Sequence, residues 1–161
     1  MKHISYSELK IWAECPYKHK LMYIDRVKGF VGNEFTAFGK AIHEVCEFSI
    51  AGILDDPEDF FNLTFERELS SINLEDNKLI TEMRDQGRAL IPHIIPEVKK
   101  TFGNYEVFSV EERLYEDVND VEMEYKMKGF IDLVLKTEDG KYHIIDWKTC
   151  SWGWKAEKKT S

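Results

Sequence analysis

The apolar residues of this chain change their spacing near Gly103, and this change constrains the fold more than any other feature of the sequence. Before Gly103 they recur every three or four residues, which is typical of helices buried along one face. Beyond it they alternate, in the stretches 105–116 and 121–129, as in strands with one buried face. Helices followed by strands predict an α+β domain, in which helices flank a small, mostly antiparallel or mixed sheet.

Capping residues and prolines delimit the expected helices. Ser5, with Glu8 three residues later, is a capping box that opens a first short helix. Pro16 suits the first turn of a second helix. The stretch 28–35 is expected to be a loop.

Three longer helical regions are expected before the strands. The first runs from Phe35 to Ile53, and its apolar stripe consists of Phe35, Phe38, Ile42, Val45, Ser49 and Ile53. The second covers 57–70. The third covers 75–101 and is expected to be interrupted near Pro92 and Pro96.

The length of 161 residues predicts one domain, spanning residues 1–161, with a core of its own. Hydrophobic residues make up 43% and charged residues 32%, as in soluble globular proteins. No apolar run approaches the roughly 20 residues of a membrane span, and the N-terminus has no signal-peptide core, so no membrane partner is expected. The three cysteines are widely spaced, which favours reduced thiols and a cytoplasmic location.

The formal net charge of −8 makes the chain, on charge alone, a poor nucleic-acid binder. Any contact with DNA therefore requires local basic patches or bound cations.

The stretch "GFIDLVLKTEDGKYHIIDWKT" (129–149) predicts a β-hairpin, but each of its apolar runs carries an acid, Asp132 or Asp146. A two-residue Asp-Gly loop would set these acids on opposite faces. A three-residue loop, 138–140, would set them directly opposite one another with Cβ atoms ~5 Å apart. Lys148 shares the face of Asp146, because side chains alternate along a strand.

Two such carboxylates persist together if they share a proton or bind a cation. Their oxygen atoms favour a hard ion, Mg²⁺ or Mn²⁺, and the nearby Lys148 could stabilise developing negative charge. The alternative is a structural salt bridge between Asp132 and Lys148.

His43 is the third candidate ligand. Gly39, one helical turn before it, is expected to leave open space beside the imidazole, and Glu47 lies one turn after it. A lone histidine in such a stripe is more often a hydrogen-bonded core residue. A carboxylate pair elsewhere in the chain makes it a better candidate for a ligand.

Four segments together resemble the RecB-like exonuclease branch of the PD-(D/E)XK nuclease superfamily, whose fold is restriction-endonuclease-like. They are "SYSELKIWAECPYKHKLMYI", "FGKAIHEVCE", "MKGFIDLVL" and "HIIDWKT", in this order. The resemblance implies that His43, Asp132, Asp146 and the backbone carbonyl of Trp147 ligate a divalent metal. It also implies that Lys148 acts with the two acids in catalysis, by activating or orienting the attacking water.

For two glutamates, the resemblance leaves two roles possible. Glu111 is either an acid of the same site, as in relatives with an acid at the start of a core strand, or an exposed strand residue. Glu47 either supports His43 or is solvated.

The chain departs from this branch near its C-terminus. Many relatives continue into a helix carrying Gln-x-x-x-Tyr, so the chain is either truncated or a divergent short form. Cys15 matches one ligand of the iron–sulfur cluster that some relatives hold, but Cys46 and Cys150 do not supply the rest. No cluster is therefore expected within these residues, and Cys15 is expected to be a small buried hydrophobe.

The tail places Trp152 and Trp154 beside Lys155. These side chains are candidates for stacking on bases and pairing with phosphates, or they belong to a packing tail.

Two functions are consistent with these observations. The first is a Mg²⁺- or Mn²⁺-dependent deoxyribonuclease, an exonuclease serving recombination, repair or phage DNA processing in the cytosol of a bacterium or a phage-infected host. Its partners would be DNA and a helicase or recombination protein. The second is a non-catalytic nuclease-fold module that binds DNA or a helicase-like partner. The intact set of ligands and lysine favours the enzyme.

Overall fold

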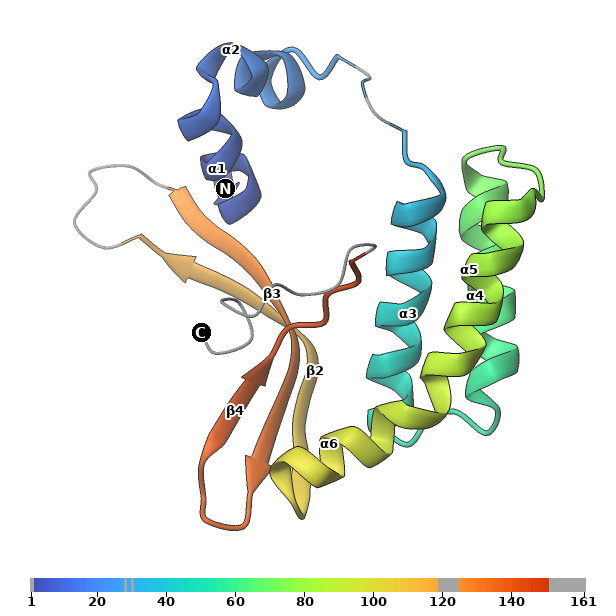
Figure 1. Cartoon of the computed structure of the whole chain (residues 1–161). Helices are drawn as coiled ribbons and strands as arrows, with labels where there is room; N and C mark the ends of the chain where they lie inside the picture. Colours follow the sequence, from blue (N-terminus) through green and yellow to red (C-terminus); the bar gives the residue numbers. More distant parts are fainter. Residues whose placement is uncertain (1, 28, 30, 119–124, 151–161) are drawn as a thin grey trace. The chain divides into compact units, whose positions relative to one another are not determined.

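The computed structural model describes residues 2–27, 29, 31–118 and 125–150 (Figure 1). The chain divides into two compact units. The sheet unit comprises Met1–Gly32 and Asn104–Ile145, and the helical unit comprises Asn33–Gly103 and Asp146–Ser161. The expectation of one domain over the whole chain stays a prediction.

The sheet unit is built on one long strand, β3 (Tyr125–Thr137). β2 (Tyr105–Asp117) pairs antiparallel along one edge of it. On the other edge, β4 (Tyr142–Ile145) pairs antiparallel with one end, and β1 (Lys2–Ser5) pairs parallel with the other end. The sheet of the described residues is therefore mixed, and the α+β class is confirmed.

Two expectations about the strands need correction. The alternating run 121–129 does not end before the hairpin: its described part is continuous with the first hairpin strand, and together they form β3. β1 was not expected, because four residues that pair with a strand far along the chain carry no local signal.

Short helices follow β1. Ser5 caps α1 (Tyr6–Glu14) by accepting a hydrogen bond from the Glu8 N–H at 3.2 Å. The Glu8 carboxylate pairs with His19 Nε2 at 2.9 Å, which ties α1 to α2 (Pro16–His19). α2 continues into the π-helical turn η1 (Lys20–Ile24).

Cys15 lies between α1 and α2 and is exposed, so the expectation of a buried residue was wrong. Both helix ends meet at this residue, which leaves its side chain outside the packed face.

The helical unit begins with α3 (Glu34–Ile50), which opens with a capping box between Asn33 and Thr36. α4 (Pro57–Ser71) and α5 (Lys78–Leu90) follow. The turn η2 (Ile91–His93) separates α5 from α6 (Ile94–Phe102). The break lies at Pro92 alone, because Pro96 falls in the first turn of α6, where proline is tolerated. Among the described residues, no helix is long and apolar enough to cross a membrane.

The core of the helical unit is aromatic. Phe38 contacts the rings of Phe61 and Phe65 edge-on, and those two rings stack on one another. Gly87 allows α5 to lie close to the ring of Phe61 on α4, because a Cβ at residue 87 would be 2.1 Å from that ring. The buried members of this core are Ala37, Phe38, Ala41, Ile42, Val45, Cys46, Phe61, Phe65, Leu69, Ile80, Met83 and Ile91.

The expected apolar stripe of α3 is correct in its middle and wrong at its ends. Phe35 is 43% exposed and Ile53, which lies beyond the end of the helix, is 68% exposed.

Candidate active site

His43 and Glu47 lie one turn apart on the same face of α3. Each offers a ligand atom, an imidazole nitrogen or a carboxylate oxygen, and the two atoms lie within 4.8 Å of one another. His43 is half-buried, and Glu47 is only 4% exposed. The alternative of a solvated Glu47 is therefore wrong. A buried carboxylate is costly unless it is paired or binds a metal, so a partner is expected for Glu47.

The sequence predicted open space beside Gly39, and this expectation was wrong, because Thr149 occupies that space. A Cβ at residue 39 would lie 3.2 Å from Thr149 Oγ1. Gly39 therefore admits the segment 146–150 close against α3, one turn before His43. This close approach accounts for a glycine at residue 39.

Trp147 anchors the same segment. Its side chain is partly buried and packs against the core of the helical unit. Its neighbours Asp146 and Lys148 are 62% and 53% exposed. A large apolar anchor thus holds the short Asp-Trp-Lys segment and leaves its two charged side chains accessible.

The ammonium of Lys148 contacts two oxygen atoms that the sequence identified as candidate metal ligands. It donates hydrogen bonds to Asp146 Oδ1 and, at 3.3 Å, to the carbonyl oxygen of Trp147. Two predicted ligand oxygens thus converge on one positive group. This donor set fits a hard divalent cation.

Asp132 lies in β3 and is half-buried. The flanking pairs Val110–Leu133 and Glu112–Ile131 show that Glu111 lies across from it on β2. Glu111 is exposed and has φ +49°, in the left-handed region that a strand residue other than glycine rarely adopts. Such backbone strain is concentrated at functional sites, and the role of Glu111 as an acid of the site stays a prediction.

The hairpin between β3 and β4 has the three-residue loop. The Thr137 N–H donates to the Lys141 carbonyl at 3.0 Å, and Gly140 adopts φ +79°. Hydrogen bonds from Lys141 and Thr137 hold the pKa of Asp139 in this turn well below its usual range. The pairing ends at Leu133–Ile145. Asp132 and Asp146 are therefore the next residues beyond the last pair at the same end of the hairpin, as that register requires.

The edge of β3 is open at Asp132. β1 pairs with β3 as far as Lys128, and β4 pairs with it only from Leu133. Among the described strands, none covers this edge between residues 129 and 132. This gap leaves room beside Asp132 for a group that is not a strand.

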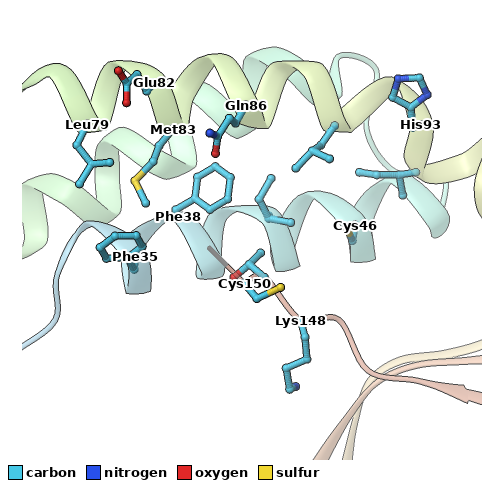
Figure 2. A pocket seen from close by; sticks show the side chains of 14 residues that line it. Phe35, Phe38, Cys46, Leu79, Glu82, Met83, Gln86, His93, Lys148 and Cys150 are labelled. Carbon is cyan, nitrogen blue, oxygen red and sulfur yellow. The ribbon is translucent and has the colours of Figure 1, made fainter. Parts of the chain in front are cut away.

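The helical unit also contains a pocket of about 780 Å³ (Figure 2). Its walls are mainly apolar side chains of α3, α5 and α6, and the segment 148–150 forms one border. Figure 2 shows the Lys148 side chain directed away from the helices. Of the described residues, the group that could hold a metal ion includes His43 and Glu47, and neither of these lines the pocket.

The structure thus brings together His43 with Glu47, Asp146 with Lys148 and the Trp147 carbonyl, and Asp132 with Glu111. Trp152, Trp154 and Lys155 lie outside the described residues. The contact between Gly39 and Thr149 was missed, because the glycine spacing signals a close approach but not its partner.

A family model of the PD-(D/E)XK nuclease superfamily matches residues 3–160 of the chain. No curated protein matches it.

Proposed function

Because the chain belongs to the PD-(D/E)XK nuclease superfamily, we propose that it is a deoxyribonuclease that requires Mg²⁺ or Mn²⁺. The family establishes a nuclease domain.

One observation carries the proposal furthest. Lys148 Nζ donates hydrogen bonds to Asp146 Oδ1 and to the Trp147 carbonyl oxygen. Thr149 of the same segment lies close to Gly39, on the helix that carries His43. Oxygen ligands, a histidine and a lysine are thus available around one short segment, as metal-assisted phosphodiester hydrolysis requires.

We assign the metal ligands as His43, Asp132, Asp146 and the carbonyl oxygen of Trp147. The register of the hairpin and the open edge of β3 support the inclusion of Asp132. When bound, the ion supplies a Lewis acid that polarises the phosphate and lowers the pKa of a coordinated water. Glu47 holds the imidazole of His43 in orientation, and Glu111 is a further acid at the edge of the same site.

Lys148 acts on the reacting groups in this proposal. Its ammonium lies beside two ligand oxygens, where it can hold the attacking water and offset the negative charge that develops on the phosphate. Its exposure of 53% leaves it free to change partners when DNA binds.

The resemblance to the RecB-like branch further favours an exonuclease that serves recombination, repair or phage DNA processing. A helicase or recombination protein would then be a natural partner. This finer assignment rests on the four sequence segments alone.

The direct test is incubation of the chain with linear and with circular DNA, in Mg²⁺, Mn²⁺ or EDTA. We expect cleavage of linear DNA with either ion and none in EDTA. Asp146→Asn should abolish cleavage, whereas Asp85→Asn, which changes an exposed acid on α5, should not. Cleavage in EDTA, or an active Asp146→Asn, would contradict the proposal. Cleavage of circular DNA would exclude a strict exonuclease.

A further inference from the structure

One face of the sheet unit carries a group of cations and aromatic rings, which we call the basic strip. The registers Lys128–Tyr115, Phe130–Arg113 and His3–Lys126 set these residues on one face, because residues directly opposite on paired strands share a face. Asp132 follows on the same face of β3, two residues after Phe130. The members of the basic strip are His3, Arg113, Tyr115, Lys126, Lys128 and Phe130.

The cations of the basic strip lie over its rings. Arg113 Cζ is 5.8 Å and Lys128 Nζ is 5.3 Å from the ring centroid of Phe130. Lys126 Nζ is 5.5 Å from the ring centroid of Tyr115, and the His3 ring is 6.2 Å from the same ring. These contacts order long side chains that would otherwise be mobile.

The strip is positive although the chain has a net charge of −8. Lys126 forms an ion pair with Asp117 at 3.0 Å. Arg113 and Lys128 form none with any residue that the structure describes, so their charges remain available. Phe130 is 54% exposed, so its ring is accessible to a ligand.

The strip leads to the proposed site. Lys126 and Asp132 are six residues apart on β3, which is about 20 Å along the strand, enough for several nucleotides. Cations, an exposed ring and then an acid succeed one another along this face.

From this arrangement we infer that the basic strip binds a single strand of DNA and guides it to Asp132. Arg113 and Lys128 pair with phosphates, and Phe130 stacks on a base. A duplex hides the faces of its bases, so only a single strand can use the exposed ring. The inference rests on the proposed function for the destination of the strand, but not for the binding itself.

The other side of Asp132 provides a matched control. There, Phe108 is 59% exposed and contacts the ring of Tyr142, over which Lys136 lies. This group has one cation over its rings instead of three. Phe108 therefore matches Phe130 in residue type, sheet and exposure, but lacks the charge that a phosphate backbone requires.

The test measures binding of fluorescent oligo(dT) and of a blunt duplex by anisotropy in EDTA, where no metal-dependent cleavage occurs. Phe130→Leu should weaken oligo(dT) binding about 5- to 100-fold, as for loss of one stacked base, and change duplex binding less than about 2-fold. Phe130→Tyr should retain the affinity, and Phe108→Leu should behave as the wild type. Lys128→Gln should reduce the salt slope for oligo(dT) by about 0.7.

Wild-type affinity in Phe130→Leu, equal weakening for the duplex, or equal weakening by Phe108→Leu would overturn the inference. These outcomes are separable from failure of the proposed function. A chain that binds oligo(dT) through Phe130 but cleaves no DNA with any ion would retain the strip and refute the nuclease. If the chain cleaves DNA but Phe130→Leu binds oligo(dT) as the wild type does, the nuclease assignment stands and the role of the basic strip is refuted.

Discussion

Helix α3 holds His43 and Glu47 by packing, whereas strand β3 holds Asp132 by its register with its neighbours. In the helical unit, Glu47 is buried, Trp147 is packed on the core and Thr149 lies against Gly39. In the sheet unit, the hairpin loop and the strained Glu111 determine which residues lie around Asp132. Substitutions in the first region should therefore change stability, and those in the second should change activity alone.

Lys148 is an exception within the helical unit. Its neighbours are packed, but its own side chain is exposed, so its substitution should change activity more than stability. Lys148→Ala should reduce the cleavage rate by about 10²–10³-fold, as for loss of one electrostatic stabiliser. Its ion pair with Asp146 is exposed, so the free energy of unfolding should fall by less than about 1 kcal/mol. Cleavage rate and urea denaturation are measured on the same preparation.

Lys141 is the matched control for this prediction. It pairs with Asp139, two residues before it, as Lys148 pairs with Asp146, and its side chain is 72% exposed. Lys141→Ala should leave the cleavage rate unchanged. A loss of several kcal/mol in Lys148→Ala, with unaltered cleavage per folded molecule, would assign Lys148 to the structure instead of catalysis.

Trp147 should show the largest effect on stability among the site residues. Trp147→Ala removes a side chain packed against the core, and we expect a loss of about 2–4 kcal/mol, somewhat less than for a fully buried tryptophan. Trp12→Ala, at a 55% exposed position on α1, should change the free energy by less than about 0.5 kcal/mol. Equal urea midpoints for the two variants would show that the segment 146–150 is not anchored by packing.

The contact between Gly39 and Thr149 should fix the position of the segment 146–150 and thereby affect the cleavage rate. Gly39→Ala adds a Cβ at 3.2 Å from Thr149 Oγ1, which must displace the segment by a few tenths of an ångström. We expect cleavage to fall about 10-fold, because small displacements of catalytic groups are costly. The double variant Gly39→Ala/Thr149→Ala should recover most of the rate. Independent, additive effects of the two substitutions would contradict the contact.

The smallest expected effect concerns Glu68, which joins α4 to Lys40 on α3. The hydrogen bond from Lys40, and then that from Arg67, lower the pKa of Glu68. A lowered folded-state pKa stabilises the protein above the unfolded-state pKa, and this contribution is lost as pH falls through the folded-state value. Glu68→Gln should therefore cost up to about 1 kcal/mol at pH 7 and nothing in strong acid. A pH-independent difference in unfolding free energy would refute this.

Local signals predicted more of this molecule than long-range ones. The Asp139-Gly140 turn determines the hairpin register, and Pro57 and Pro92 determine helix limits, because each acts within a few residues. The parallel pairing of β1 and the approach of Thr149 to Gly39 depend on residues more than 100 positions apart, and no local pattern encodes them.

The basic strip was missed for a different reason. Lys126, Lys128 and Phe130 alternate along β3, but their partners Arg113 and Tyr115 are identified only by the register. The sequence alone shows that Lys126, Lys128 and Phe130 share one face of a strand. Only the strand pairing shows that Arg113 and Tyr115 lie beside them.

The central claim is that His43, Asp132 and Asp146 ligate one divalent ion, and a Mn²⁺ titration by calorimetry tests it most directly. We predict one site in the wild type, a metal-dependent rise in melting temperature, and at least about 10-fold weaker binding in each of His43→Ala, Asp132→Asn and Asp146→Asn. Asp85→Asn, an exposed control, should bind as the wild type does. Unchanged Mn²⁺ affinity in Asp132→Asn, with weakened affinity in His43→Ala, would show that the acid on β3 and the histidine on α3 do not share an ion.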